Sequence, residues 1–321
     1  MKTIICLVLL ILFGTMTEAQ IYYVQDMSTV EITALDKEKT VVILPGGILE
    51  QHGPYLPVFT DGYMNQALTM EIANSIIKRP GWKVLIFPTV PLGSGGANEI
   101  GRKYNFSGTY AVRHNILRSI FMDWGSELGD QGFEKIFVVH MHGAPNHNQA
   151  IDQACDYFSE TYNGRMVNIW NLAFSYNEEL RNEQEQKEDG FTVHAGVGET
   201  SILYHLKPDL KKTGYKNAPP ITAASPEDLV TLAKEKEWPG YFGSPRLANS
   251  NLGEKSWKGW TNHIIKQVEN ILDSKYDFNK PTYYQIMSNN PVFKLINEDA
   301  KTFDRQKELK QNAWLKSKGF D

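Results

Sequence analysis

Short apolar runs alternate with longer amphipathic segments along most of the chain. The apolar runs are rich in β-branched residues and predict strands at residues 40–44, 83–91, 135–143 and 164–172. Between them, apolar positions recur with helical spacing and predict helices over about 63–78, 109–128 and 148–162. This order is typical of an α/β domain with a mainly parallel sheet.

The rest of the chain is more polar. Residues 177–190 form a charged stretch, which we interpret as a solvated helix face or loop. After about Ser274 polar residues dominate, and residues 297–320 have the pattern of a terminal helix. We therefore expect a main domain over residues 20–274 and a C-terminal helical extension over residues 275–321.

Composition narrows the class of protein. The chain has 321 residues, of which 41% are hydrophobic and 22% charged, as expected of a soluble globular protein with a sizeable core. Its net charge of −4 gives no electrostatic reason to expect nucleic acid or an anionic membrane as a partner. We therefore expect a small-molecule substrate.

The first 19 residues differ from the rest. Lys2 precedes an apolar run from Ile4 to Phe13, and small residues at Thr17 and Ala19 stand before Gln20. This pattern predicts a signal peptide cleaved between Ala19 and Gln20, and hence a secreted or periplasmic protein without a membrane anchor. The alternative is an uncleaved anchor, although the apolar run is short for a membrane span. Cleavage removes Cys6 and leaves Cys155 as the only thiol, so no internal disulfide is expected.

A cluster of possible metal ligands follows the first strand. The strand at 40–44 is closed by "PGG", and "EQHGPYLPVFTD" then supplies Glu50, His52 and Asp61. On an extended segment Glu50 and His52 point to the same side, and Asp61 can return to them after the turn. One Glu, one His and one Asp fit a zinc or manganese site. A capped loop or a surface ion pair is the structural alternative.

Two further polar clusters lie at predicted loop positions. "VVHMHGAPNHNQA" holds His140, His142 and His147 at the end of another strand, where a lone histidine would more often be a core residue. "HAGVGETS" holds His194 and Glu199, with a potential helix cap at Thr200 or Ser201. We expect the three clusters to converge on one crevice, because ligands in open α/β sheets bind at the carboxyl ends of the strands.

Three segments, in this order, resemble the signature segments of the creatininase (creatinine amidohydrolase) family: "PGGILEQHGPYLPVFTD", "VVHMHGAPN" and "HAGVGETS". Residues 88–109 and 240–253 agree with it more weakly. The resemblance implies a three-layer α/β/α domain that holds two divalent ions (zinc, manganese or iron). It also implies a homo-oligomer, often a hexamer.

Carried over residue by residue, the resemblance implies Glu50 and His142 as ligands of one ion. It implies His52 as a ligand of the other ion and Asp61 as the bridge. The chain departs from creatininase at Ala144, where that enzyme has a glutamate that helps to hold the second ion. Glu199 is our candidate for the missing ligand, with His140 or His147 as the alternatives. The resemblance also implies that His194 carries protons in catalysis, and the chemistry of the site leaves Glu199 as the alternative proton carrier.

The expected activity is metal-dependent hydrolysis, in which an activated water attacks a small cyclic amide or a related carbonyl compound. The family cleaves C–N bonds and, in some members, C–C bonds. The departure at Ala144 argues against creatinine as the substrate. The rival hypothesis is a secreted, non-catalytic protein that binds a sugar-like ligand on the same fold. Tightly bound metal would favour the enzyme.

Overall fold

A computed structural model describes residues 21–320, so the predicted signal peptide lies outside the described residues. The described chain contains a five-stranded, all-parallel sheet in the order β1-β3-β2-β4-β5. Its strands are β1 (Ile21–Tyr23), β2 (Thr40–Pro45), β3 (Lys83–Ile86), β4 (Lys135–Val139) and β5 (Arg165–Asn168). The predicted mainly parallel sheet is confirmed.

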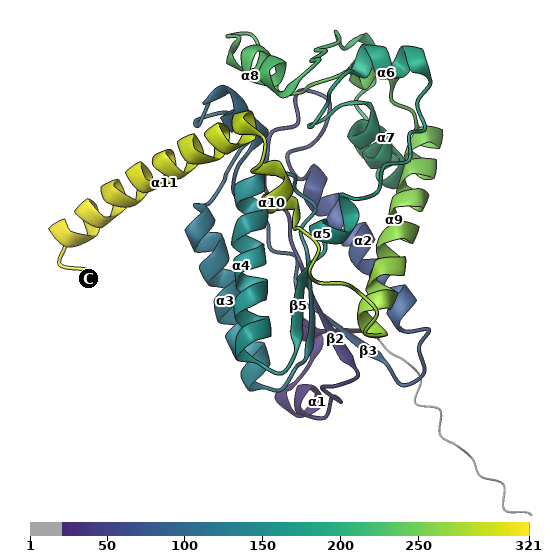
Figure 1. Cartoon of the computed structure of the whole chain (residues 1–321), viewed down its shortest axis with the longest axis vertical. Helices are drawn as coiled ribbons and strands as arrows, with labels where there is room; N and C mark the ends of the chain where they lie inside the picture. Colours follow the sequence, from purple (N-terminus) through teal and green to yellow (C-terminus); the bar gives the residue numbers. More distant parts are fainter. Residues whose placement is uncertain (1–20, 321) are drawn as a thin grey trace, which may run out of the picture.

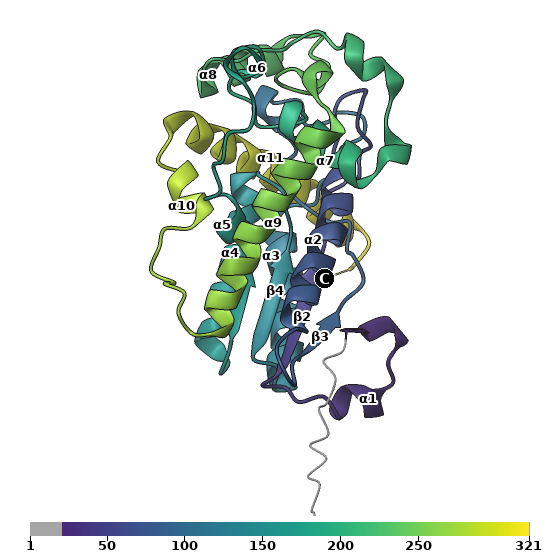
Figure 2. The same ribbon diagram turned by 90° about the vertical axis from the view of Figure 1, so that its right-hand side faces the viewer.

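Helices cover both faces of this sheet (Figures 1 and 2). The larger ones are α2 (Thr60–Ile76), α3 (His114–Asp130), α4 (Pro145–Thr161), α7 (Val197–Leu206), α9 (Ser250–Leu272) and α11 (Pro291–Ser317). The shorter ones are α1 (Thr29–Thr33), α5 (Trp170–Ala173), α6 (Glu183–Asp189), α8 (Pro226–Lys234) and α10 (Tyr283–Met287). Single 3-10 turns connect several of them, among them η2 (Ala97–Gly101).

Alternate residues of the central strands enter two separate cores. Val41 and Ile43 of β2 pack with α2 and α9 on one face of the sheet. Val42 and Leu44 pack with α3 and α4 on the other face, where Cys155 is buried as a free thiol. All four side chains have no solvent exposure, because a parallel sheet is covered on both sides. The molecule is therefore a three-layer α/β/α domain, as predicted.

Some predicted boundaries were wrong. Strand β3, predicted over residues 83–91, already ends at Ile86. Pro88 and Pro91 have no N–H to donate to a neighbouring strand, so the strand cannot continue through them. The last strand ends at Asn168, whose side chain accepts a hydrogen bond from the N–H of Trp170 at the start of α5. The helix predicted from residue 109 begins at His114.

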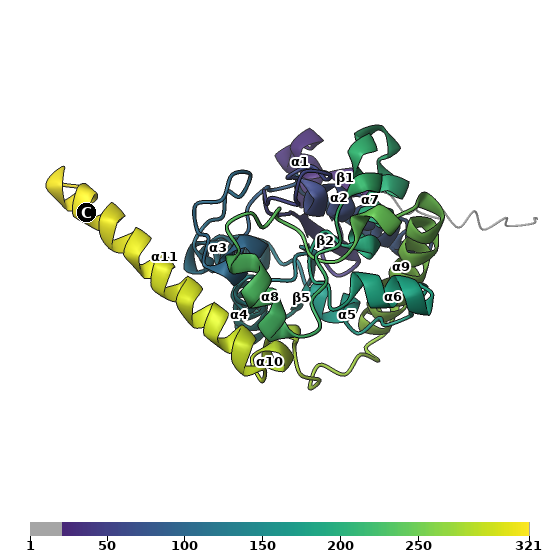
Figure 3. The same cartoon turned by 90° about the horizontal axis from the view of Figure 1, so that it is seen from above.

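The C-terminal extension contains two helices after α9. α10 lies beside α4 and α5, and α11 begins near α8 and then runs away from the body of the molecule (Figures 1 and 3). The predicted terminal helix is present, but it starts at Pro291 and not at residue 297. Among residues 21–320, no helix is both long and apolar enough to cross a membrane.

Candidate metal centre

The first two clusters start side by side because β2 and β4 are neighbours in the sheet. The last residues of these strands, Pro45 and Val139, are paired in register, so the loops that follow them leave from one edge. Gly46 makes this close approach possible. A Cβ added at Gly46 would lie 1.7 Å from Nε2 of His140, so no larger residue fits.

The remaining site residues come from helices. Asp61 lies in the first turn of α2, and Glu199 lies in the first turn of α7. His194 precedes α7, and Ala195 adopts a left-handed conformation with φ of 55°. The carboxylate of Glu199 accepts a hydrogen bond of 2.6 Å from the N–H of Ala195, which fixes this turn. Gly196 is the N-cap of α7, so the predicted cap at Thr200 or Ser201 was wrong.

Glu50, Asp61 and His142 form a first group of converging side chains. Nδ1 of His142 lies 3.2 Å from Oε2 of Glu50 and 3.1 Å from Oδ2 of Asp61. Nε2 of His142 is 2.9 Å from the carbonyl oxygen of Gly95 and donates to it, which leaves Nδ1 with a free lone pair. The group thus presents one nitrogen and two carboxylate oxygens to a single point.

A second group consists of His52, Asp61 and Glu199. Nε2 of His52 lies 3.2 Å from Oδ1 of Asp61 and 3.3 Å from Oε1 of Glu199. Nδ1 of His52 is 2.9 Å from the carbonyl oxygen of Glu50 and donates to it. Asp61 therefore turns one carboxylate oxygen to each group, as a residue that bridges two ions would.

These donors fit divalent ions. All ligand atoms within each group lie within 4.8 Å of one another, and four of the five side chains in the two groups are buried. Oε2 of Glu50 and Oδ2 of Asp61 are buried without a hydrogen-bond donor among the described residues. Buried carboxylates need either a proton or a cation. One nitrogen and two oxygens per position suit zinc or manganese.

The electrostatics of the groups without metal support the same conclusion. Burial lowers the pKa of His52, but Glu199 and Asp61 outweigh it and hold this pKa well above its ordinary value. The pKa of His142 is raised in the same way, by Glu50 and Asp61 against burial. Burial raises the pKa of Glu50, but the positive charge that His194 and His142 carry when protonated outweighs burial and lowers this pKa. A positive charge is therefore strongly favoured within each of the two groups.

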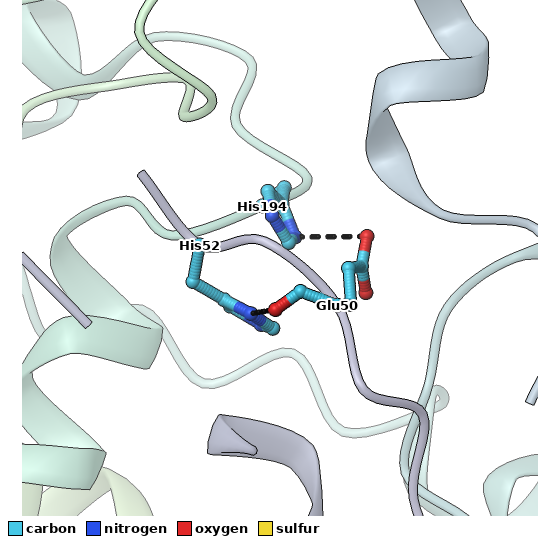
Figure 4. Close-up of side chains that lie close together, drawn as sticks. All are labelled: Glu50, His52 and His194. Atoms are coloured by element: carbon cyan, nitrogen blue, oxygen red, sulfur yellow. Dashed lines mark hydrogen bonds and ion pairs between the residues drawn. The ribbon is translucent and has the colours of Figure 1, made fainter. Parts of the chain in front are cut away.

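His194 completes the centre from the third cluster. Its Nε2 donates to the carbonyl oxygen of Gln51 at 2.6 Å, so Nδ1 is the free nitrogen. Nδ1 lies 3.8 Å from Oε1 of Glu50, which is longer than the distances in the two groups above (Figure 4). His194 also forms a third group with Glu50 and His52, in which the ligand atoms lie within 4.8 Å of one another. Burial lowers the pKa of His194 despite the charge of Glu50, which favours the neutral ring. A neutral imidazole beside the ligands is suited to accept a proton.

The other two histidines of the second cluster lie deeper. His140 and His147 have no exposure, and their rings are tilted at 33° to each other with centroids 5.4 Å apart. Burial lowers the pKa of His140 to about 3. Nδ1 of His147 accepts a hydrogen bond from the N–H of Ser94. Neither ring belongs to a metal-binding group in the described chain, so Glu199 is better placed than either as the ligand that Ala144 cannot provide.

The groups open into a cavity of about 560 Å³. Its walls include residues that the sequence analysis did not connect with the site. Arg181 and Asp189 come from the charged stretch, which was interpreted as a solvated face or loop. That interpretation was wrong for Asp189, which is fully buried and accepts hydrogen bonds from the N–H groups of Val197 and Ser244. One acidic residue among several in a charged run gives no signal of such burial.

Comparison with known proteins agrees with this geometry. The family model described as creatinine amidohydrolase matches residues 25–268. A mycofactocin precursor peptide peptidase of Mycobacterium ulcerans is 26% identical over 235 residues, 71% of this chain and 84% of the relative. A creatinine amidohydrolase of Pseudomonas putida is 25% identical over 223 residues, 67% of this chain and 83% of the relative.

Solved structures show the same fold. A crystal structure of creatinine amidohydrolase superposes with a TM-score of 0.57 at 21% identity, and covers 78% of this chain and 97% of that chain. A creatininase with manganese has the same score and identity, with 98% of that chain covered. The family match spans most of the main domain, and the relatives named with an activity are hydrolases. The chain therefore belongs to the creatininase family of hydrolases.

Proposed function

We propose that this protein is a two-metal hydrolase that cleaves an amide-type C–N bond in a small molecule or short peptide. The observation that carries the proposal is the sharing of Asp61 between two groups, each with one histidine nitrogen and two carboxylate oxygens. Two divalent ions bound there would supply an activated water and a positive charge for the carbonyl oxygen of the substrate. The names of the relatives, a peptidase and an amidohydrolase, support amide cleavage.

The residues of this chain then have separate tasks. Glu50 and His142 hold one position, His52 and Glu199 hold the other, and Asp61 joins them. His194 presents Nδ1 toward the same space because its Nε2 is held by the carbonyl of Gln51. We assign His194 the transfer of a proton from the attacking water to the leaving nitrogen.

The experiment combines metal removal with a matched pair of variants. We expect purified protein to release amine from at least one member of a panel of cyclic amides, formamides and dipeptides. Chelation should reduce this release to background, and zinc or manganese should restore it. His194→Gln should keep the metal and lose most turnover. His205→Gln, on α7 but outside the cavity, should behave as wild type. Turnover that survives complete metal removal would contradict the proposal.

We also propose that the protein acts outside the cytoplasm. The support is the apolar run Ile4–Phe13 followed by small residues before Gln20. Amino-terminal sequencing of protein from the exported fraction should begin at Gln20. Protein that starts at Met1 in the cytoplasmic fraction would show the opposite.

A further inference from the structure

The C-terminal extension forms one wall of the cavity at the metal centre. Six of its residues line the cavity, namely Tyr283, Met287, Phe293, Ile296, Asn297 and Ala300. The family match ends at residue 268, before this extension begins. The wall is thus a feature of this chain in addition to the part that matches the family.

Hydrogen bonds and ion pairs hold this wall in place beside the ligands. The hydroxyl of Tyr283 donates to the carbonyl oxygen of Gly143 at 2.6 Å, next to His142. On α11, Asp299 pairs with Arg102 at 2.6 Å, and Asp304 pairs with His114 at 2.7 Å. The first half of α11 is therefore fixed to the main domain at several points and is not a loose tail.

Two buried amides in the cavity wall have unused hydrogen-bonding atoms. Nδ2 of Asn146 donates to the carbonyl oxygen of Asn297 at 3.0 Å, which leaves Oδ1 of Asn146 as an acceptor without a partner in the described chain. Nδ2 of Asn297 is likewise a donor without a partner in the described chain. The two side chains are only 4% and 6% exposed, and both residues line the cavity. A buried polar atom without a partner is costly, so such pairs are normally satisfied by a ligand or an ordered water.

Both atoms have almost no contact with solvent in this conformation, so the two side chains must rotate toward the cavity before an amide group of a ligand can match this pair. Its carbonyl oxygen can accept from Nδ2 of Asn297, and its N–H can donate to Oδ1 of Asn146. The surrounding surface is apolar, with Met287 and Ile296 from the extension. Trp170 lies across from them, with its ring 5.6 Å from that of Tyr283. A bulky apolar substituent beside the amide would bury its surface there.

We propose that the extension is a substrate subsite. It binds an amide group through Asn146 and Asn297, and it holds the apolar substituent next to that amide against Met287 and Ile296. This inference rests on the proposed function, because it places the bound amide beside the hydrolytic centre. It names the substrate class as amides or short peptides with a bulky apolar group, such as a branched aliphatic or aromatic side chain.

Binding of two small probes tests the subsite without relying on turnover. Metal-loaded His194→Gln protein is titrated calorimetrically with N-acetyl-leucinamide and with N-acetylglycinamide. We expect the leucine probe to bind about tenfold or more tightly, because its side chain buries several carbon atoms. Asn297→Leu in this background should weaken both probes about tenfold or more, whereas Met287→Ala should reduce only the preference for the leucine probe.

Thermal stability separates a binding role from a structural one. If Nδ2 of Asn297 has no partner within the chain, Asn297→Leu should not lower the melting temperature. Leu295→Ala is the matched control, since Leu295 is 53% exposed on the same helix and outside the cavity. The control should bind both probes unchanged.

Three results would overturn the subsite. They are equal affinity for the two probes, no binding of either probe, or an Asn297→Leu protein that melts earlier while it binds normally. If neither probe binds, a water molecule is the partner of the side-chain amides of Asn146 and Asn297. Failure of the proposed function has a different signature, namely absence of metal or metal-independent turnover in the wild-type protein.

Discussion

At the scale of single residues, the central question is whether Glu199 takes the role that the family resemblance gives to a glutamate at the position of Ala144. The structure places Oε1 of Glu199 at 3.3 Å from Nε2 of His52, in the group that also contains Asp61. Ala144 itself is the N-cap of α4, and its methyl side chain has no oxygen to offer. Glu199 on α7 therefore provides a carboxylate from a different element.

Replacement of Glu199 by Gln should remove one ion selectively. A neutral amide keeps the shape of the side chain but loses the charge that a divalent cation requires. We expect occupancy near one ion per chain, and turnover reduced tenfold for each ~1.4 kcal/mol of transition-state stabilisation that is lost.

Metal content and kinetics are compared with those of Glu227→Gln, an exposed control on α8. If Glu199→Gln retains two ions but loses turnover, Glu199 is a proton carrier and not a ligand. If Glu199→Gln retains both two ions and full turnover, Glu199 does not belong to the site.

Glu99 gives a second prediction at this scale, for the metal-free protein. It lines the cavity and is half-buried, and burial, followed by the charge of Asp304, raises its pKa to about 8. Between the ordinary value of 4.5 and about 8, the folded protein binds a proton that the unfolded chain releases. The free energy of unfolding should therefore fall as pH rises through this window.

Glu99→Gln removes this effect. The variant should melt a few degrees above wild type at pH 8 and close to wild type at pH 5, with the difference reduced by water that reaches a half-buried group. Melting curves in chelator at both pH values measure it. A difference that is the same at pH 5 and pH 8 would contradict the raised pKa.

At the scale of secondary-structure elements, the packing of α7 against α9 positions Glu199. Gly253 of α9 faces the carbonyl of Ser201 on α7, and a Cβ added there would lie 2.0 Å from this oxygen. Gly253→Ala must push the helices apart and should cost about 1–3 kcal/mol. We expect a lower melting temperature and weaker retention of one ion. Lys255→Ala, an exposed neighbour on α9, should change neither. An unchanged melting temperature for Gly253→Ala would contradict this role of the contact.

The elements also show what the sequence could predict and why the rest was missed. Strands β2 and β4 were predicted because β-branched runs closed by Gly or polar residues carry a local signal. The early end of β3 was missed, although Pro88 indicates it. The amphipathic pattern of α9, with Trp257, Thr261, Ile264 and Val268 on its buried side, was present in the sequence but was not interpreted as a helix. The wall formed by α10 and α11 has no local signal, because it depends on contacts such as Tyr283 with Gly143.

At the scale of the whole molecule, the site exists because loops from adjacent strands and the first turns of α2 and α7 meet at one sheet edge. The family resemblance predicted which residues meet, whereas composition and periodicity predicted only that polar clusters follow strands. The predicted homo-oligomer stays a prediction. The far part of α11 projects from the body (Figure 1). Its Leu309 and Trp314 are exposed, as is Phe320 just after the helix, and light scattering in solution would measure the assembly.

The metal content of protein purified without chelator tests the central claim most directly. Plasma mass spectrometry should find two divalent ions per chain in the wild type. It should find almost none in Asp61→Ala, because Asp61 offers an oxygen to both groups. Asp228→Ala, an exposed control on α8, should keep both ions. A wild-type protein without stoichiometric metal, or an Asp61→Ala protein that retains two ions, would contradict the two-metal centre.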